Sequence, residues 1–396
     1  MSLRLFLVAG EPSGDRLGAA LMAGLKTLYP EPITFEGIGG PLMEAEGLKT
    51  IFPMAELSHI GLTEILRNLP ALLRRVSQTV DTILSDRPDA LITIDIPEFS
   101  LRVANKVKAR AHDLPTIHYV APTVWAWRPA RARKMALSID HVLALLPFEP
   151  PYMEAAGMTC DFVGHPVVTE PLADQAGVTA FRDAHGIAPD ERVLLVLPGS
   201  RRSEIERLAP IFGQTLERVL TSHPKMRVVL PAAPAVADQV MAAVADWPGA
   251  PIVLDPRGTP ADVFAAEKRA AFAAADLALA ASGTVSLELA ATSTPMVIAY
   301  ATNWLSQTLV TSLLRVDTVT LVNLVSGTRV VPEFLGPRCQ PSLIAPALAQ
   351  LIDDEAARTA QVEAMGLTME RLGRGGQPPG QRAAGCVLDH LGIINR

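Results

Sequence analysis

Short apolar runs alternate with segments of helical periodicity along nearly the whole chain. The runs are continuously apolar, which is typical of strands that are covered on both faces. Helical patterns separate them, for example at residues 15–28, 204–220 and 260–274. This order predicts an α/β fold of parallel sheets with right-handed crossovers. The strands are expected at residues 3–9, 90–95, 116–120 and 141–146, and then at 192–197, 227–230, 251–254, 277–281 and 295–299.

A Pro-punctuated stretch from Gly164 to Pro171 interrupts the series of strands. It predicts two Rossmann-like domains that face a cleft, at residues 1–167 and 168–350, because 396 residues suffice for two domains. The remaining residues, 351–396, are expected to form a helical tail that packs back on the N-terminal domain or on a partner subunit. Ligands of doubly wound sheets bind beyond the carboxyl ends of the strands, so the loops after the strands are the candidate site.

The charge balance excludes one class of function. Lys and Arg total 35 against 41 Asp and Glu, a net charge of -6, whereas a protein that coats nucleic acid is normally basic. We therefore expect no nucleic-acid partner. The three cysteines are odd in number and far apart, which fits a reducing compartment. The first apolar run is too short for a signal peptide, and no run reaches about 18 apolar residues, so a cytoplasmic protein without a membrane span is expected.

The first candidate loop follows the strand at 192–197 and contains Gly199, Ser200 and Arg201. A glycine allows a tight turn, and the N-terminus of the following helix offers N–H groups to a phosphate. The guanidinium of Arg201 adds a planar fork of permanent charge. A capping box formed by Ser203 and Glu206 is the alternative explanation of this helix end.

The second candidate loop follows the strand at 277–281 and contains Ser282, Gly283 and Thr284. Its hydroxyl and amide groups are suitable donors to a diphosphate, and Glu288, one turn into the helix, is a suitable acceptor for ribose hydroxyls. An ordinary N-cap followed by a solvated Glu explains the same residues. Together the two loops predict a nucleotide-diphosphate site. Neither is a P-loop, because no GxxxxGK[ST] occurs, so ATP hydrolysis is disfavoured.

A carboxylate ends one predicted strand of the first domain. Asp95 stands at the end of the strand at 90–95, where a general base would point toward a ligand. An Asp that begins a turn before proline is the alternative. Glu11 and Asp15 in the first loop are competing bases or orienting groups. No Asp-x-Asp triplet occurs and the histidines have no metal-ligand spacing, so a metal site is disfavoured.

An apolar stripe lies on one face of the predicted helix around residues 62–76. It includes Leu69, Leu72 and Leu73, with basic residues beside it. Such a stripe is typical of a core-facing helix, and a membrane-surface helix is the alternative.

A second segment combines indole rings with cations, at Trp125, Trp127 and Arg128. It fits either a solvated basic turn or a site for a phosphorylated lipid, because Trp and Arg both occur at bilayer interfaces.

These motifs occur in the order of a known family. The chain resembles lipid-A-disaccharide synthases over nearly its whole length, least after about residue 351. The matching motifs are Gly10-Glu11-Pro12-Ser13-Gly14-Asp15, Gly39-Gly40-Pro41, Ile94-Asp95-Ile96-Pro97, Tyr119-Val120-Ala121-Pro122-Thr123-Val124-Trp125-Ala126-Trp127, Leu146-Pro147-Phe148-Glu149, Leu197-Pro198-Gly199-Ser200-Arg201 and Ser282-Gly283-Thr284.

The resemblance implies an inverting, metal-independent glycosyltransferase of the two-Rossmann (GT-B) type that needs no cofactor. Its substrates would be UDP-2,3-diacylglucosamine and 2,3-diacylglucosamine 1-phosphate (lipid X), and its products UDP and a β-1,6 disaccharide of lipid A biosynthesis. It further implies peripheral association with the anionic surface of the inner membrane, and a homodimer is a further expectation.

The resemblance also implies roles for individual residues. Asp95 matches the catalytic Asp, and Arg201 and Asn323 match positions linked to UDP binding or activity. Glu11 and Asp15 match an acidic pair of the first loop. Pro12 and Val322 depart from the family pattern and affect local loop shape only.

Two other classes share part of these features. A muramyl-type N-acetylglucosaminyltransferase or a UDP-sugar epimerase would have the UDP loops without needing the Trp segment or the apolar stripe. A bilobed solute-binding protein would also consist of two α/β domains, but such proteins are usually exported with a signal peptide.

Overall fold

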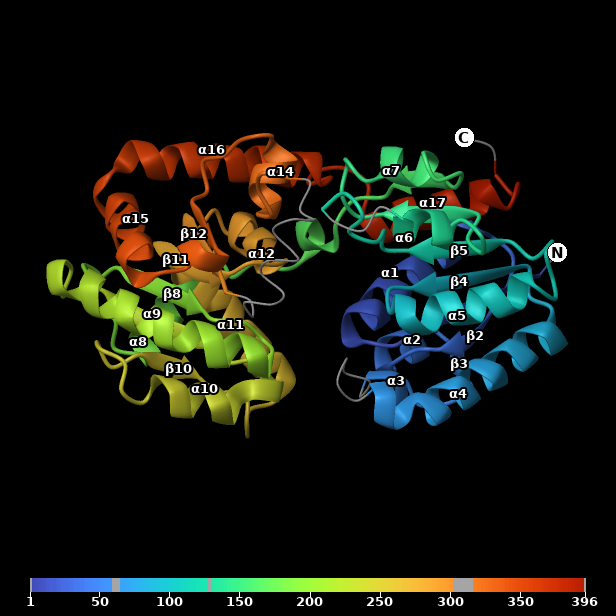
Figure 1. The fold of residues 1–396 in the computed structure, drawn as a ribbon, viewed down its shortest axis with the longest axis horizontal. Helices are drawn as coiled ribbons and strands as arrows, with labels where there is room; N and C mark the ends of the chain where they lie inside the picture. Colours follow the sequence, from blue (N-terminus) through green and yellow to red (C-terminus); the bar gives the residue numbers. More distant parts are fainter. Residues whose placement is uncertain (1, 59–64, 127–129, 302–315, 395–396) are drawn as a thin grey trace. The chain divides into compact units, whose positions relative to one another are not determined.

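The chain forms two compact units, each with its own parallel sheet. The computed structural model describes residues 2–58, 65–126, 130–301 and 316–394. Unit 1 comprises Met1–Thr169 and Gly375–Arg396, and unit 2 comprises Glu170–Arg374. In each unit helices cover both faces of the sheet (Figure 1). The predicted fold class of two parallel α/β sheets is confirmed.

The sheet of unit 1 has seven strands in the order β3-β2-β1-β4-β5-β6-β7, all parallel. The strands are β1 (Leu3–Ala9), β2 (Ile33–Ile38), β3 (Lys49–Thr50), β4 (Ala90–Ile94), β5 (Thr116–Tyr119), β6 (His141–Ala144) and β7 (Thr159–Phe162). The helices are α1 (Pro12–Leu28), α2 (Pro41–Ala45), α3 (Ala55–Ser58), α4 (Ile65–Asp86), α5 (Pro97–Lys108), α6 (Ala130–Met135), α7 (Pro150–Glu154), the 3-10 turn η1 (Pro166–Thr169) and α17 (Pro379–His390).

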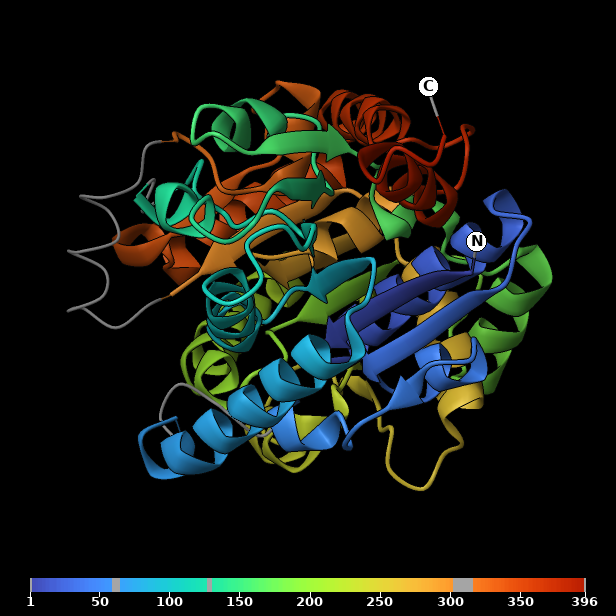
Figure 2. The same cartoon turned by 90° about the vertical axis from the view of Figure 1, so that its right-hand side faces the viewer.

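Two buried apolar clusters stabilise the two faces of this sheet. One contains Leu21 of α1 and Val387 of α17, both fully buried. The other contains Val76 of α4 and Val103 of α5, also fully buried. Figure 2 shows α4, the long light-blue helix, along its face of unit 1. Because each such side chain contributes about 1.5–3 kcal/mol when buried, the continuous apolar runs of the strands account for this layered core.

The last helix packs against the first. A Cβ atom at Gly24 of α1 would lie 2.6 Å from the carbonyl oxygen of Gly380 in α17. A Cβ atom at Gly380 would lie 2.5 Å from the carbonyl oxygen of Ala20, so glycine at both positions permits this close approach. Arg382 donates a hydrogen bond to the carbonyl of Phe162 at 2.9 Å. The segment expected to be a single tail is therefore divided between the units, with α17 in unit 1 and the preceding helix in unit 2.

The sheet of unit 2 has six parallel strands in the order β10-β9-β8-β11-β12-β13. They are β8 (Val193–Leu197), β9 (Arg227–Pro231), β10 (Ile252–Leu254), β11 (Leu277–Ala281), β12 (Met296–Tyr300) and β13 (Glu333–Leu335). The helices are α8 (Gln175–Ala184), α9 (Arg202–Ser222), α10 (Ala237–Val244), α11 (Ala261–Ala274), α12 (Val285–Ala291), α14 (Leu321–Ser326), α15 (Pro341–Asp353) and α16 (Glu355–Arg371), with 3-10 turns η2 (Pro234–Val236) and η3 (Gly336–Arg338).

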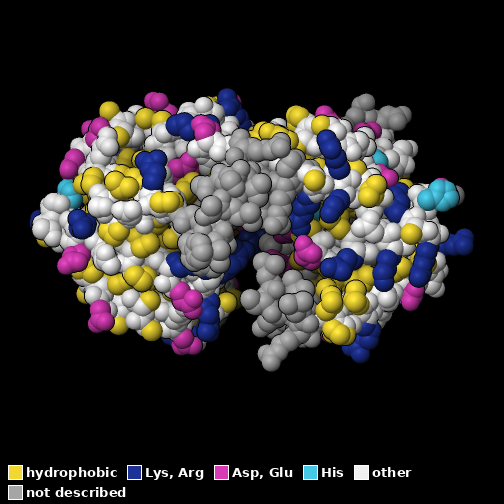
Figure 3. Space-filling model, viewed as in Figure 1, with side chains coloured by type: hydrophobic (Ala, Val, Ile, Leu, Met, Phe, Trp, Pro, Cys, Tyr) yellow, Lys and Arg dark blue, Asp and Glu magenta, His cyan; other side chains and the backbone are white. Residues whose placement is uncertain are grey.

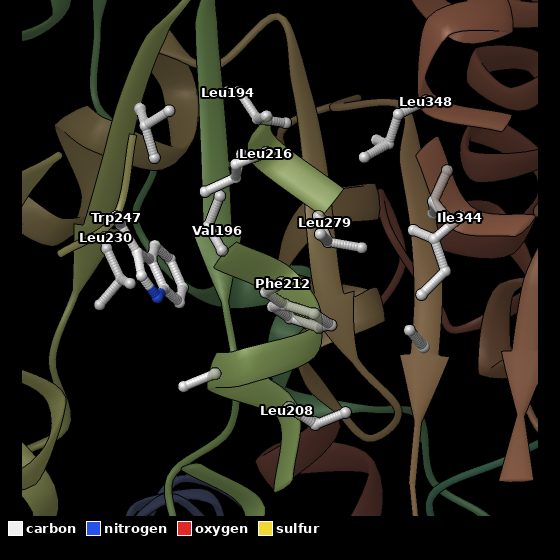
Figure 4. Close-up of a cluster of buried hydrophobic side chains, with 14 of the residues drawn as sticks. Leu194, Val196, Leu208, Phe212, Leu216, Leu230, Trp247, Leu279, Ile344 and Leu348 are labelled. Atoms are coloured by element: carbon white, nitrogen blue, oxygen red, sulfur yellow. The ribbon is translucent and has the colours of Figure 1, made fainter. Parts of the chain in front are cut away.

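The core of unit 2 forms where α9 and α15 cover the sheet. Figure 4 shows Phe212 of α9 among Val196 of β8, Leu279 of β11 and Ile344 of α15. All four side chains are essentially fully buried. The helical spacing of the apolar residues in α9 aligns its buried face with the continuously apolar strands, and this packing holds the loop before α9 in place.

Two strands of unit 1 end one residue earlier than expected, for a physical reason. The strands expected at 90–95 and 116–120 end at Ile94 and Tyr119. The next residues have left-handed backbone, with φ of 52° at Asp95 and 85° at Val120. Non-glycine residues in this region cost about 1–3 kcal/mol each and cluster at functional sites, so the two adjacent strand ends are candidates for such a site.

Candidate active site

The carboxyl ends of β1, β4, β5 and β6 lie at one edge of the sheet of unit 1, because these strands are parallel neighbours. Glu11 is the N-cap residue of α1, directly after β1, and its side chain is exposed. Asp95 follows β4. The structure therefore brings the loops of two predicted acidic residues to one edge, as expected for ligand-binding loops of a doubly wound sheet.

Asp95 is half-buried at this edge. Its backbone N–H donates to the carbonyl of Tyr119 at 3.0 Å, and its own carbonyl accepts from the Ser100 hydroxyl at 2.8 Å. Burial raises the pKa of the Asp95 carboxyl, and a backbone hydrogen bond from Ile96 partly opposes that shift. A carboxylate with a raised pKa is a stronger base, so this environment suits proton abstraction.

Asp15 has a different environment. Its carboxylate is buried and accepts three backbone hydrogen bonds around the start of α2, from Gly40 at 2.9 Å, Leu42 at 3.1 Å and Met43 at 3.0 Å. These N–H groups are the unpaired donors of a helix N-terminus, and a carboxylate is their best acceptor. Of the two roles expected for Asp15, base or orienting group, the geometry favours the orienting one.

The Trp segment lies only partly within the described residues. Trp125 is buried, its indole N–H donates to Glu149 at 3.3 Å, and its ring meets Phe148 edge to face at a centroid distance of 5.2 Å. Trp127 and Arg128 lie outside the described residues. These contacts favour a packing role for the Trp125 indole inside the loop over a position at a bilayer interface.

The apolar stripe on α4 belongs mainly to the core. Leu72 is 3% exposed within the cluster between α4 and the sheet, and Leu69 is half-buried against the same cluster. The burial of Leu72 favours the core-facing interpretation of this residue over lipid contact. Leu73 is 39% exposed and is available for contact. In the part of the chain that the structure describes, no helix has the length and mean hydropathy of a membrane span.

A pocket of about 590 Å³ lies at the carboxyl ends of the strands of unit 2. Both predicted phosphate loops line it, together with α11 and the residues after β9. Its lining includes Gly199, Ser200, Arg201, Ser282, Gly283, Thr284 and Glu288. The structure thus brings together loops that are about 80 residues apart in the chain, at the place where doubly wound sheets bind ligands.

The cap of α9 differs from the expected one. The Glu204 carboxylate, not a Ser203–Glu206 pair, closes the helix by accepting the N–H groups of Ser200 at 2.9 Å and Arg201 at 3.2 Å. Gly199 has φ of 115°, and a Cβ atom there would lie 2.4 Å from the same carboxylate. Because these two N–H groups already have an acceptor, the structure favours helix capping over phosphate binding as their role. The Arg201 side chain is 78% exposed and offers its charge instead.

The second loop is open and carries an unexpected cation. The Gly283 carbonyl accepts the Ser286 hydroxyl at 2.9 Å, and no atom lies within 4 Å of where a Cβ of Gly283 would stand. Lys268 of α11 lies 2.6 Å from the Glu288 carboxylate. Sequence reasoning missed Lys268, because it stands mid-helix in an Ala-rich segment, 20 residues before its partner. The pocket therefore has two cationic side chains, Arg201 and Lys268.

Asn323 does not line this pocket. It is buried in α14, where its side-chain amide pairs with the backbone of Val331, donating to the carbonyl at 2.9 Å and accepting from the N–H at 3.1 Å. A second bond of its amide nitrogen reaches the Thr318 hydroxyl at 3.3 Å. These hydrogen bonds connect α14 to the residues before β13, which is a structural role.

A larger depression of about 740 Å³ lies between α9 and α10. Its rim carries the carboxylates of Glu206, Glu217 and Asp246. These charges would repel a diphosphate. The two carboxylates that line the smaller pocket, Glu204 and Glu288, are each paired with a cation, Arg201 and Lys268. For a phosphorylated ligand the smaller pocket is the better site. No group of three or more metal-ligating side chains occurs among the described residues.

Comparison with known structures places the fold. The S. aureus MnaA–UDP structure matches with a TM-score of 0.66 at 14% identity, covering 100% of this chain and 98% of that one. A glycosyltransferase from Rickettsia africae matches with a TM-score of 0.58 at 10% identity, covering 100% and 99%. At such identities the likeness shows the fold alone, a GT-B-like pair of parallel α/β sheets.

Comparison of sequences places the family. The chain is 64% identical to a lipid-A-disaccharide synthase of Ruegeria pomeroyi, over 98% of this chain and 96% of that protein. It is 48% identical to one from Rhodospirillum centenum, over 98% and 94%. The family model described as lipid-A-disaccharide synthetase matches residues 5–377. The match spans both units and every loop described above, and the chain belongs to the lipid-A-disaccharide synthase family.

Proposed function

We propose that the chain is a glycosyltransferase that joins UDP-2,3-diacylglucosamine to 2,3-diacylglucosamine 1-phosphate. The products are UDP and the β-1,6-linked disaccharide 1-phosphate of lipid A biosynthesis. The observation that carries the proposal is the family match over residues 5–377, at 64% identity to a protein of that name. The pocket of unit 2 and the strand-end loops of unit 1 supply groups suited to the two substrates.

The UDP part of the donor would occupy the pocket of unit 2. Arg201 and Lys268 would offset the charge of the diphosphate, and the hydroxyls of Ser282 and Thr284 would donate to its oxygens. Preorganised donors of this kind act most strongly where charge develops, here on the departing UDP. Glu288 would accept from the ribose hydroxyls, either while paired with Lys268 or after that cation turns to the phosphates.

The acceptor would bind at the strand-end loops of unit 1. Asp95 would take the proton of the acceptor 6-hydroxyl while that oxygen attacks the anomeric carbon of the donor. The bond to UDP breaks as the new bond forms, the anomeric configuration inverts, and the proton remains on Asp95. Glu11 is the alternative base, and Asp15 would hold the chain around Gly40 in place beside the first loop. The reaction requires Asp95 to come within hydrogen-bond reach of the hydroxyl.

Because the proposed substrates are acylated, we expect the protein to bind the cytoplasmic surface of the inner membrane. The exposed Leu73 of α4 and basic side chains of the neighbouring helices would make this contact. Figure 3 shows Lys and Arg side chains on the surface of unit 1 over α5 and its neighbours. The exposed basic residues of these helices include Arg74, Arg102, Lys106, Arg133 and Lys134, and Arg110 is exposed just after α5. Each would contribute on the order of 1 kcal/mol at an anionic surface.

UDP release tests the proposal. The purified protein is mixed with donor and acceptor in detergent micelles containing EDTA, and UDP and the disaccharide are measured by mass spectrometry. We expect both products in equal amounts, because each transfer releases one UDP. We expect activity to persist in EDTA, because Arg201 and Lys268 supply the charge that a metal ion would otherwise supply. Activity lost in EDTA and restored by magnesium would contradict the metal-independent mechanism. Epimerisation of UDP-N-acetylglucosamine without an acceptor would favour a UDP-sugar epimerase.

The oligomeric state is a separate prediction. A homodimer is expected, and sedimentation equilibrium of the purified chain tests it. A mass near the 42.2 kDa of one chain at all concentrations would contradict a dimer.

A further inference from the structure

The loops that follow β5 and β6 are joined by one buried carboxyl group. Glu149, just before α7, is 3% exposed. One oxygen accepts from the indole N–H of Trp125 at 3.3 Å, and the other accepts from the backbone N–H of Leu146 at 3.0 Å. Phe148 contacts the same indole edge to face. The ring of Trp125 is therefore fixed by a hydrogen bond and by an aromatic contact from one short segment.

The segment anchored in this way leads directly to Asp95. Residues 120–126 begin at Val120, whose N–H donates to Leu143 of β6 at 3.0 Å. The preceding residue, Tyr119, accepts the hydrogen bond from the backbone of Asp95. Three neighbouring strand ends are thus connected, and the side chain of Trp125 anchors the far end of the segment.

The segment needs such an anchor. Val120 has φ of 85°, which is a strained conformation for a β-branched residue. Strain of this kind persists only when surrounding contacts over-determine the backbone. Beyond Val120 the described backbone bonds of the segment are short-range, from Val124 to Pro122 at 2.6 Å and from Ala126 to Thr123 at 3.3 Å. The side chains of Ala121 and Val124 are buried in the apolar cluster on this face of the sheet. At the far end of the segment Trp125 is held by the hydrogen bond to Glu149 and by the ring contact with Phe148.

Stability alone does not explain a carboxyl group at this position. Burial in an apolar environment disfavours the charged form, and an apolar side chain of similar volume is often equally or more stabilising there. A carboxyl group differs from such a side chain in offering two acceptor oxygens, and both are used, one for each loop. The distinctive effect of the Glu149 carboxyl group is therefore to fix the positions of these two loops.

We propose that Glu149 is a positioning residue for the acceptor, which holds Trp125 and thereby fixes residues 120–126 next to the backbone of Asp95. Glu149 itself does not touch the substrate. The inference rests on the proposed function, because it assumes that the acceptor binds at this edge of unit 1. It adds a residue whose effect is confined to acceptor binding.

Three variants and one control test it. Glu149→Met keeps the volume without an acceptor, Glu149→Gln keeps one acceptor oxygen, and Trp125→Phe keeps the ring without the N–H. Glu154→Gln makes the same chemical change on an exposed carboxylate of α7. We measure KM for the lipid X acceptor, KM for the donor, kcat, and the Kd of lipid X in micelles by calorimetry without donor.

We expect Glu149→Met to raise the acceptor KM and Kd about tenfold and Glu149→Gln about threefold, the range of one or two lost hydrogen bonds. The donor KM should stay unchanged, and the control should behave as wild type. Trp125→Phe should match Glu149→Gln, and combining the two should add little, because they remove the same contact.

An unchanged acceptor KM and Kd in folded Glu149→Met would overturn the inference, and so would an equal rise of donor and acceptor KM. Should Glu149→Met not fold, Glu149→Gln and Trp125→Phe decide by the same measurements. A wild-type protein that binds lipid X without making disaccharide, and whose binding weakens in Glu149→Met, supports the positioning role while contradicting the proposed reaction.

Discussion

The backbone N–H of Asp95 donates to the carbonyl of Tyr119 at 3.0 Å, directly beyond the last paired residues of β4 and β5. The residue that follows each strand has a left-handed backbone conformation, at Asp95 itself and at Val120. The main chain of Asp95 is therefore fixed to the neighbouring strand end. Its carboxylate takes no part in the backbone hydrogen bonds between β4 and β5. Rigid placement of the backbone with a half-buried carboxylate is what a general base requires.

Asp95→Asn should lower turnover by about two to four orders of magnitude, the range typical of a lost general base. The UDP affinity should stay unchanged, because the proposed UDP pocket lies in unit 2. Steady-state kinetics and UDP calorimetry measure the two effects, with circular dichroism as the folding control. Near wild-type turnover would reject Asp95 as the base and make Glu11→Gln the next variant to measure.

Asp15→Asn should lower the free energy of unfolding by about 1–3 kcal/mol, because an amide has one acceptor oxygen for three buried N–H donors. Urea denaturation measures this loss. Asp81→Asn is the matched control, since that carboxylate forms an exposed ion pair with Arg110 and should change stability little. Full stability of Asp15→Asn together with lost activity would indicate a direct catalytic role instead.

Arg201→Ala and Lys268→Met should each weaken UDP binding by about tenfold or more and lower turnover with it, since both cations line the pocket. Isothermal calorimetry with UDP gives the affinity. Arg202→Ala, an exposed neighbour that does not line the pocket, is the control. If Lys268→Met leaves the UDP affinity intact while Arg201→Ala reduces it, Lys268 only neutralises Glu288.

Leu73→Ser should reduce co-sedimentation with anionic vesicles while the fold and UDP binding persist, because that side chain is exposed. Leu72→Ser should instead lower the free energy of unfolding by about 2–5 kcal/mol, the cost of removing a large buried side chain. Vesicle sedimentation and urea denaturation separate the two effects. Normal vesicle binding by folded Leu73→Ser would show that this part of α4 is not the membrane contact.

Stability should depend on pH through Glu149. Burial raises the pKa of this carboxyl from 4.5 to about 7. Between these values the native state keeps the proton that the unfolded chain has lost, so stability from this group is complete below pH 4.5 and is lost as pH rises toward 7. The loss is at most about 1.4 kcal/mol per pH unit.

Two histidines oppose this trend. Burial lowers the pKa of His118 and of His165 from 6.5 to about 4, so both are neutral in the native state and their effect makes stability rise with pH in that range. Urea denaturation of wild type and Glu149→Gln at several pH values isolates the carboxyl. The variant should gain stability relative to wild type as pH rises toward 7, and a difference that does not vary with pH would contradict the raised pKa.

The layered fold was predictable because its strands are continuously apolar and its helices are periodic. The strands β2, β3, β7 and β13 were not predicted. Of these, β3 consists of Lys49 and Thr50 and carries no apolar signal. The pocket loops were predictable from Gly and Ser next to strand ends. Lys268 was not, because a lysine in a helix looks the same whether it faces solvent or a pocket.

Periodicity also could not separate Leu72 from Leu73. Both lie on the apolar side of α4, and only the packed sheet decides which one is buried. The cap of α9 was misplaced by two residues for a similar reason, since Ser203–Glu206 and Arg201–Glu204 have the same spacing and the register depends on the left-handed turn at Gly199.

The glycine contact between α1 and α17 has a consequence for synthesis on the ribosome. All strands of unit 1 precede unit 2 in the sequence, but one face of the sheet of unit 1 is completed by residues 379–390, which are made after unit 2. Unit 2 lies wholly within the intervening residues, so it can finish folding first although it is made second. Until residues 379–390 have left the ribosome, the apolar side chains that α17 covers stay exposed on the nascent chain. A ribosome that stops before residue 379 therefore leaves a finished unit 2 joined to an unfinished unit 1, which marks truncated chains for chaperones and proteases.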